Sequence, residues 1–336
     1  MRTVPLPALT RADVLRRANE YMAELQIFEQ VRVSERVARI GLEQVCTLML
    51  EWLWDTVAEP ILTALGLDGP PADGAWPRIW WCPTGPLALL PVHAAGYHDP
   101  DDPLAHRSVL DRVISSYTPT VRALEYASTA TPVPKQDRLL VVSLPVTPGM
   151  PDLWSVSREQ TILAQLLPDQ HTDLTDTKAS HHAILEGLAD HRWVHASCHG
   201  TQNLDEPSTG GLIPYDWQSA GLITIADIAG IDSAGGEFIF LCACKTATSG
   251  VRNVDEAITL AAGLNYLGWR HVLATLWSTW DGAAADISGL VYQHLVAGRQ
   301  LDPSMSALAL HQAIRHYRDI HAYQPSRWIP FIHLGP

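Results

Sequence analysis

The chain has 336 residues, of which 47% are hydrophobic and 18% are charged, and its formal net charge at pH 7 is −13. This composition is typical of a globular protein with a sizeable core. The negative charge disfavours direct binding of nucleic acid, because the phosphate groups would be repelled. No apolar run is long enough to span a membrane and no signal peptide is visible, so we expect a cytoplasmic protein that makes no membrane contact.

The five cysteines are an odd number in a chain without a secretion signal, which argues against a disulfide framework and for reduced thiols. One or more of these thiols therefore has the potential to do chemistry. The cysteines are Cys46, Cys82, Cys198, Cys242 and Cys244.

The N-terminal part is predicted to begin with helices. Apolar residues recur at three- and four-residue spacing over 11–29 and 35–66, which predicts two amphipathic helices. The sequence RIWWCPTGPLALLPVHAAG (78–96) contains two short apolar runs broken by a turn, and it predicts a hairpin-like pair of strands.

A polar, proline-bearing segment, STATPVPKQD (129–138), is the best linker candidate in the chain. We therefore predict an N-terminal domain of residues 1–134, made of helices and an α/β part, and a second domain of residues 135–336.

Strand and helix patterns alternate from residue 139 onward, which predicts a parallel sheet with crossover helices. Several of the predicted strands are apolar throughout, as is typical of central strands covered on both faces. The fold class predicted for this part is therefore a three-layer α/β sandwich with a mostly parallel sheet. The predicted strands are LLVVSLP, HTDLT, WVHASCHG, EFIFLCAC, HVLATLW and WIPFIHLG.

Two reactive side chains follow predicted strands at the place where open parallel sheets collect functional groups. His199 ends the strand WVHASC and is followed by Gly200, and Cys244 ends the strand FIFLCAC. A cysteine peptidase needs a thiol and an imidazole brought together from separate strand ends, and caspases place the histidine about 50 residues upstream of the cysteine. The pair is therefore a candidate catalytic dyad.

The segments HASCHG and LCACKTA resemble the His-Gly and Ala-Cys-x-Thr motifs of CHAT domains, which are caspase-like peptidases related to separase and usually attached to tetratricopeptide repeats. The likeness extends over roughly residues 45–335. It includes the blocks WWCPTGPLALLPVHAAG, SSYTPT and DEAITLAAGLNYLGWRHVLATLWSTWD.

The resemblance implies a caspase-like catalytic domain over 135–336 and a degenerate, pseudo-caspase-like region over 1–134. It further implies a cysteine endopeptidase with Cys244 as nucleophile, His199 as general acid and base, and an oxyanion hole built from the backbone N–H groups of Gly200 and Cys244. This chemistry requires no cofactor and no metal.

Three acidic residues follow the predicted dyad or lie close to it in sequence, and one of them is a candidate for substrate preference. The stretch LWSTWD resembles the place where separases receive an arginine side chain, so Asp281 is a candidate for the substrate pocket. Asp255 and Glu256 open a predicted helix, where negative charges are favoured by the helix dipole, and we interpret them as ordinary helix-start residues.

The resemblance also implies a specific protein or peptide substrate and an activating protein or tetratricopeptide region as partner, as in regulated proteases of signalling, cell death or antiviral defence. The alternative is a catalytically silent CHAT scaffold that binds a peptide or a partner protein in the old cleft. Such scaffolds usually lack the cysteine or the histidine, and this chain has both.

Zinc binding is a second chemical interpretation, because His195, Cys198, His199, Cys242 and Cys244 are all ligand types on strands expected to be neighbours. Alternation of side chains along a strand argues against it, because Cys198 would point away from the two histidines. We interpret Cys198 and Cys242 as small buried hydrophobic residues.

A further histidine, His93, lies in the N-terminal part and has no nucleophile in its own sequence block. We expect it to have a packing role.

Overall fold

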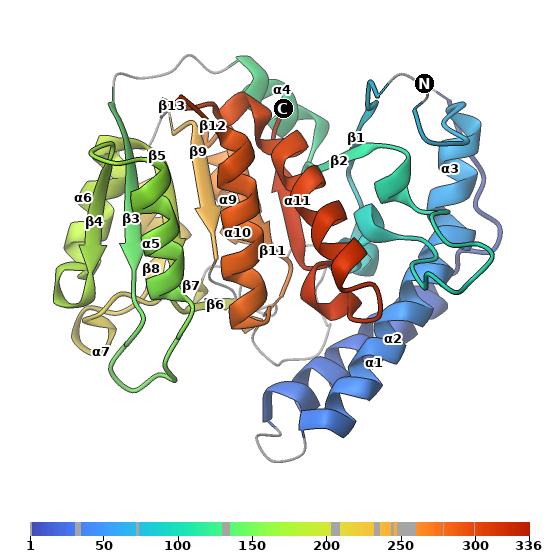
Figure 1. The fold of residues 1–336 in the computed structure, drawn as a ribbon, viewed down its shortest axis with the longest axis horizontal. Coiled ribbons are helices and arrows are strands. Elements are labelled where there is room, and N and C mark those ends of the chain that lie inside the picture. Colours follow the sequence, from blue (N-terminus) through green and yellow to red (C-terminus); the bar gives the residue numbers. More distant parts are fainter. Residues whose placement is uncertain are drawn as a thin grey trace.

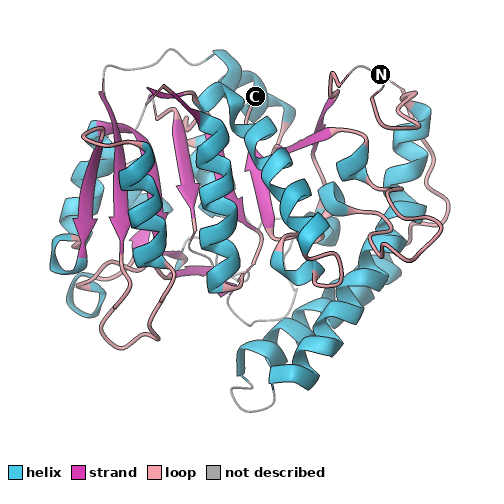
Figure 2. Cartoon of the chain, viewed as in Figure 1, coloured by secondary structure: helices cyan, strands magenta, loops and turns pink. Residues whose placement is uncertain are grey.

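The computed structural model describes residues 2–30, 35–71, 74–129, 135–202, 209–231, 236–242, 245–246, 260–277, 279–298 and 300–336. One eight-stranded sheet lies at the centre of the described part (strands are magenta in Figure 2). Its strands, in spatial order, are β1 (Arg78–Trp81), β2 (Ile114–Tyr117), β14 (Phe331–Leu334), β11 (His271–Thr275), β9 (Phe238–Leu241), β5 (His191–Ser197), β3 (Gln136–Ser143) and β4 (His171–Thr175).

The sheet is mostly parallel, as the alternating pattern predicted. Strands β11, β9, β5, β3 and β4 run in one direction, whereas β14 pairs antiparallel with β11 and parallel with β2. All residues of β9, β11 and β14 are buried, because helices cover both faces of the sheet. The apolar runs in the sequence therefore mark the central strands.

Helices form a layer on each face, which confirms the predicted three-layer α/β sandwich. On one face α10 (Asp281–Leu295) lies between α5 (Val156–Leu166) and α11 (Ser306–Ile320), as Figure 1 shows. The other layer contains α4 (Val121–Thr129), α6 (His181–Asp190), α8 (Ile225–Ala229) and α9 (Leu260–Tyr266).

Helix α6 illustrates why these segments are helical and how they pack on the sheet. The Ser180 hydroxyl accepts a hydrogen bond from the backbone N–H of Ala183 at 3.3 Å, which caps the first turn. The helix buries Ile184 and Leu188 at helical spacing. Gly187 permits close contact with β3, since a Cβ there would lie 2.6 Å from a methyl carbon of Leu140.

The two predicted N-terminal helices are confirmed. The structure has α1 (Arg11–Gln30), α2 (Glu35–Leu53), a π-helical turn η1 (Trp54–Ala58) and α3 (Glu59–Ala64). Figure 1 shows α1 and α2 side by side, projecting from one end of the molecule.

The predicted hairpin over 78–96 is wrong in its second strand. The first run is β1, but the second forms two 3-10 helices, η2 (Gly85–Leu89) and η3 (Val92–Ala94). Pro86 and Pro91 interrupt this run, and proline has no backbone N–H to donate to a neighbouring strand. β1 pairs instead with β2, in parallel.

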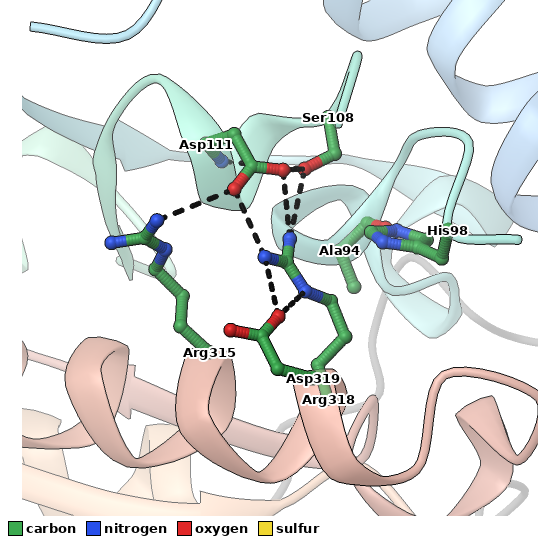
Figure 3. Close-up of polar contacts among 7 residues, drawn as sticks. All are labelled: Ala94, His98, Ser108, Asp111, Arg315, Arg318 and Asp319. Carbon is green, nitrogen blue, oxygen red and sulfur yellow. Dashed lines mark hydrogen bonds and ion pairs between the residues drawn. The ribbon is translucent and has the colours of Figure 1, made fainter. Parts of the chain in front are cut away.

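The N-terminal part is attached to the rest through the sheet and through a buried ion pair. Asp111, at the end of the 3-10 helix η4 (Val109–Asp111), accepts two hydrogen bonds from the Arg318 guanidinium of α11, at 2.7 and 3.0 Å (Figure 3). Both residues are 4% exposed, so this pair is shielded from solvent. The predicted boundary at 134/135 falls beside residues 130–134, which lie outside the described residues, and it stays a prediction.

The segment after β5 contributes to a second, small sheet. Its strands are β6 (Gly200–Gln202), β7 (Gly211–Leu212), β8 (Ile223–Thr224) and β10 (Lys245–Thr246), and a short helix α7 (Trp217–Ala220) lies between β7 and β8. The remaining described elements are η5 (Asp176–Lys178), β12 (Val296–Ala297), β13 (Gln300–Leu301), η8 (Pro303–Met305) and η9 (Pro325–Arg327). Within the described ranges, no helix combines the length and the hydropathy needed to cross a bilayer.

Candidate active site

Three predicted site residues follow the carboxyl ends of three neighbouring parallel strands. His199 comes after β5, Cys244 after β9, and Asp281 after β11, and these strands lie in the order β11, β9, β5. Carboxyl ends of parallel strands meet at one edge of a sheet, where such folds place their ligands. Cys244 itself lies outside the described residues. Asp281 begins α10, and its side chain is not among those that the structure describes.

His199 is 4% exposed and is oriented by a backbone carbonyl. Its Nε2 atom lies 2.7 Å from the carbonyl oxygen of Pro151, in the loop that follows β3. A carbonyl oxygen only accepts hydrogen bonds, so Nε2 must carry the proton. In the neutral imidazole the lone pair then resides on Nδ1, which is the nitrogen able to act as a base.

The residues on either side of Cys244 are joined to the segment that carries His199. The backbone N–H of Cys242 donates to the carbonyl of Ala196, in β5, at 2.9 Å. Lys245, in β10, pairs in parallel with Thr201 of β6. The described chain just before and just after the pair 243–244 therefore lies against the strand that precedes His199 and the strand that follows it.

The backbone of His199 and Gly200 connects the two sheets. The carbonyl of His199 accepts a hydrogen bond from the N–H of Ile213 at 2.8 Å, and Gly200 pairs with Leu212. These bonds fix where the chain leaves β5. The assignment of an oxyanion hole to the N–H groups of Gly200 and Cys244 stays a prediction.

The other cysteines differ in accessibility. Cys46 and Cys198 are buried, Cys242 is half-buried and Cys82 is exposed. Burial raises the pKa of the Cys46 thiol well above its ordinary value, which makes this thiol a poor nucleophile. The interpretation of Cys198 as a buried hydrophobic residue is confirmed, since it is 1% exposed.

His93 packs against the aromatic ring of Tyr117 deep in the N-terminal part. Its Nδ1 atom lies 3.0 Å from the Tyr117 hydroxyl, which also accepts a hydrogen bond from the His93 backbone N–H at 3.1 Å. These contacts fit the packing role expected for it. The candidate helix-start residues Asp255 and Glu256 lie outside the described residues.

A buried acidic residue that the sequence interpretation did not use lies beside the strand that leads to His199. Glu159 of α5 is 2% exposed, and its Oε2 atom lies 2.9 Å from Nε2 of His195. The signal was available, because Glu159 occupies the apolar stripe of its helix, between Val156 and Leu163. A charged residue on a core-facing stripe needs a polar partner inside the protein.

The fold of this chain is similar to that of known cysteine peptidase structures. The pro- and mature domains of RgpB from Porphyromonas gingivalis match with a TM-score of 0.51 and 9% identity, covering 87% of this chain and 76% of that chain. Two structures of the Saccharomyces cerevisiae separase–securin complex match with TM-scores of 0.58 and 0.52, both at 11% identity. They cover 96% and 97% of this chain but only 27% and 22% of those chains.

Matches at identities this low show the fold alone. They confirm the predicted caspase-like α/β class. A search of curated proteins finds no match. The sequence model of the CHAT domain matches residues 47–336, close to the extent of the motif blocks in the sequence, and the chain therefore belongs to the CHAT domain family.

Proposed function

We propose that this chain is a cysteine endopeptidase in which Cys244 is the nucleophile and His199 the general base and acid. The observation that carries the proposal is the placement of both residues after the carboxyl ends of two adjacent parallel strands, β9 and β5. The backbone contacts of Cys242 with Ala196 and of Lys245 with Thr201 support it. They hold the chain before and after Cys244 against the segment that carries His199.

The proposed reaction begins when Nδ1 of His199 accepts the thiol proton of Cys244. The thiolate then attacks the carbonyl carbon of the scissile peptide bond, and the backbone N–H groups of Gly200 and Cys244 stabilise the negative oxygen that forms. The imidazolium gives its proton to the departing amine, which leaves a thioester on Cys244. Water, deprotonated by His199, hydrolyses the thioester and releases the acid and the free thiol.

The Pro151 carbonyl supplies an orienting partner for the imidazole of the proposed dyad. It holds the Nε2 proton, so the imidazole cannot present an N–H in place of a lone pair at Nδ1. It also accepts from the imidazolium that forms during the reaction, which favours the transfer of the thiol proton.

The proposed substrate is a specific protein, and an activating protein or a tetratricopeptide region is the proposed partner. The matched relatives support a peptidase role at the level of fold: RgpB is an arginine-specific cysteine proteinase, gingipain R, and the separase structure contains securin. We further propose a cytoplasmic enzyme that acts on neither nucleic acid nor membranes, in line with the net charge of −13.

Thiol labelling tests the proposed dyad. With a limiting, mildly reactive electrophile at neutral pH, we expect fast modification at one site, mapped to Cys244 by peptide mass. Both Cys244→Ala and His199→Ala should remove the fast phase, because the first lacks the thiol and the second lacks the base that deprotonates it. The experiment is best done in a Cys82→Ser background, since Cys82 is exposed and also reacts.

Slow labelling whose rate is the same in wild type and in both variants would contradict the dyad and favour the silent scaffold. The same result with tight binding of a peptide in the absence of cleavage would identify the scaffold directly.

Substrate preference tests the proposed role of Asp281. If its carboxylate receives a basic side chain, peptides with arginine before the scissile bond should be cleaved faster than those with leucine or aspartate, and Asp281→Asn should reduce the preference. Competition assays with the three peptides in one reaction measure the ratios. Equal turnover of all three would overturn this assignment without affecting the dyad.

A further inference from the structure

A buried polar cluster lies in the layer between the sheet and helices α5 and α10. We call it the Glu159 cluster, and it consists of Glu159, His195, Ser197, Cys242 and Tyr292. One possible ligand atom from each of Glu159, His195 and Cys242 lies within 4.8 Å of the other two. This is the combination of oxygen, nitrogen and sulfur ligands that zinc accepts in proteins.

The strand register explains why these side chains converge. His195 of β5 lies opposite Phe240 of β9, and side chains two residues apart on a strand point to the same face. Ser197 and Cys242 therefore share the face of His195. Helix α5 brings Glu159 to this face and α10 brings Tyr292, whose hydroxyl lies 3.2 Å from His195 Nδ1.

The buried carboxylate of Glu159 needs a compensating positive charge. Glu159 is 2% exposed and His195 is 0% exposed, and within the described ranges the only ion-pair partner of Glu159 is this histidine, which carries a charge only when protonated. A carboxylate so far from water is costly unless a positive charge compensates it. A divalent cation bound to one carboxylate, one thiolate and one neutral imidazole gives a cluster with no net charge.

We propose that the Glu159 cluster binds a zinc ion through Glu159 Oε2, His195 Nε2 and the thiolate of Cys242. This set differs from the zinc ligands considered from the sequence, because it includes Glu159 and excludes Cys198, His199 and Cys244. Soft sulfur and imidazole ligands favour zinc over magnesium or calcium, which prefer oxygen.

The ligand atoms must rearrange to reach zinc geometry. At zinc bond lengths of about 2.0–2.3 Å, tetrahedral ligand atoms lie about 3.3–3.8 Å apart. Glu159 Oε2 and His195 Nε2 are 2.9 Å apart, so they must separate by a few tenths of an ångström. The Ser197 hydroxyl, 2.8 Å from Nε2 and 2.6 Å from Oε2, is placed to complete a four-coordinate site.

The outer partners that a zinc-bound histidine needs are already present. When the metal takes Nε2, the imidazole proton moves to Nδ1 and is donated to the Tyr292 hydroxyl. The Cys242 thiol proton is released to solvent as the thiolate binds, so binding strengthens as pH rises. The half-buried position of Cys242 offers the metal a route to the cluster.

Cobalt titration tests the site in the full chain. A Co²⁺ ion bound by a thiolate gives a charge-transfer band in the near ultraviolet, so we expect this band to saturate at one Co²⁺ per chain of metal-free, reduced wild type and to vanish when Zn²⁺ is added. Cys242→Ser should lose the band. Tyr292→Phe should keep it but weaken the affinity by about 10–100-fold, because it removes an outer partner of the histidine.

Matched controls separate this site from the proposed dyad. Cys198→Ser and Cys244→Ala should keep the band, and Zn²⁺ should raise the melting temperature of wild type but not of Cys242→Ser. Unchanged far-ultraviolet circular dichroism of metal-free Cys242→Ser shows that it folds. A band that survives Cys242→Ser, or no band in wild type, would overturn the zinc site. The readout does not need peptidase activity, so an inactive chain with the band would overturn only the proposed function.

Discussion

Cys244→Ala should lower kcat/KM for peptide hydrolysis by about 10⁴-fold or more, since the step that forms the thioester no longer exists. His199→Ala should cause a loss of similar order, because the thiol then lacks its base and the departing amine lacks its acid. The double variant should be no worse than either single one, because residues that act as a unit are strongly non-additive. Turnover of a protein or peptide substrate by wild type and the three variants measures these effects.

The control for this series is Cys82→Ser, which removes an exposed thiol far along the chain from the proposed dyad and should leave kcat/KM unchanged. Additive losses in the double variant would show that the two side chains act in separate steps. Full activity of Cys244→Ala would rule out the proposed nucleophile.

Mild acid should destabilise the protein strongly through three buried histidines. His93, His271 and His311 are at most 4% exposed, and burial lowers the pKa of each from 6.5 to about 3. Between these values the unfolded chain binds protons that the folded chain does not, so the free energy of unfolding falls as pH is lowered through this window. Each histidine contributes about 1.4 kcal/mol per pH unit, or about 4 kcal/mol for the three.

Between pH 7 and pH 5 these three histidines contribute a loss of about 6 kcal/mol, a large part of the 5–15 kcal/mol that stabilises a typical domain. Urea unfolding at both pH values measures it. His311→Phe should reduce the loss by about 2 kcal/mol, since it removes one of the titrating imidazoles and both ring nitrogens of His311 lack a hydrogen-bond partner among the described residues.

His182→Gln provides the comparison, because it removes a histidine whose side chain is 83% exposed. This variant should lose as much stability as wild type. Equal stability of wild type at pH 7 and pH 5 would contradict the acid effect.

The sequence was sufficient for the layers of the fold and for the candidate dyad, because both depend on local patterns. Apolar runs marked the buried strands, and His199 and Cys244 followed two of them. The position of β14 could not be predicted this way. Its composition identifies a buried strand, but its insertion between β2 and β11, antiparallel to β11, depends on packing across the whole chain.

The partner of His199 was also beyond the sequence, for a chemical reason. Every residue has a backbone carbonyl, so nothing in the residue types marks Pro151 as the acceptor that fixes the imidazole. Glu159 is a different case, because its position on the apolar stripe of α5 could be recognised from the sequence. Only the structure shows that its partner there is His195.

The place of β14 in the sheet constrains the order in which the protein assembles during synthesis. In the described sheet β1 and β2 pair with each other at one edge and are linked to the other strands through β14, yet β14 is the last of the eight strands along the chain. At about 5–20 residues per second, roughly 10–40 s separate the emergence of β2 from that of β14. During this time β1 and β2 have no larger sheet to join and Asp111 has no Arg318 to pair with, so the early part of the chain depends on its own helices, or on a chaperone, to avoid aggregation.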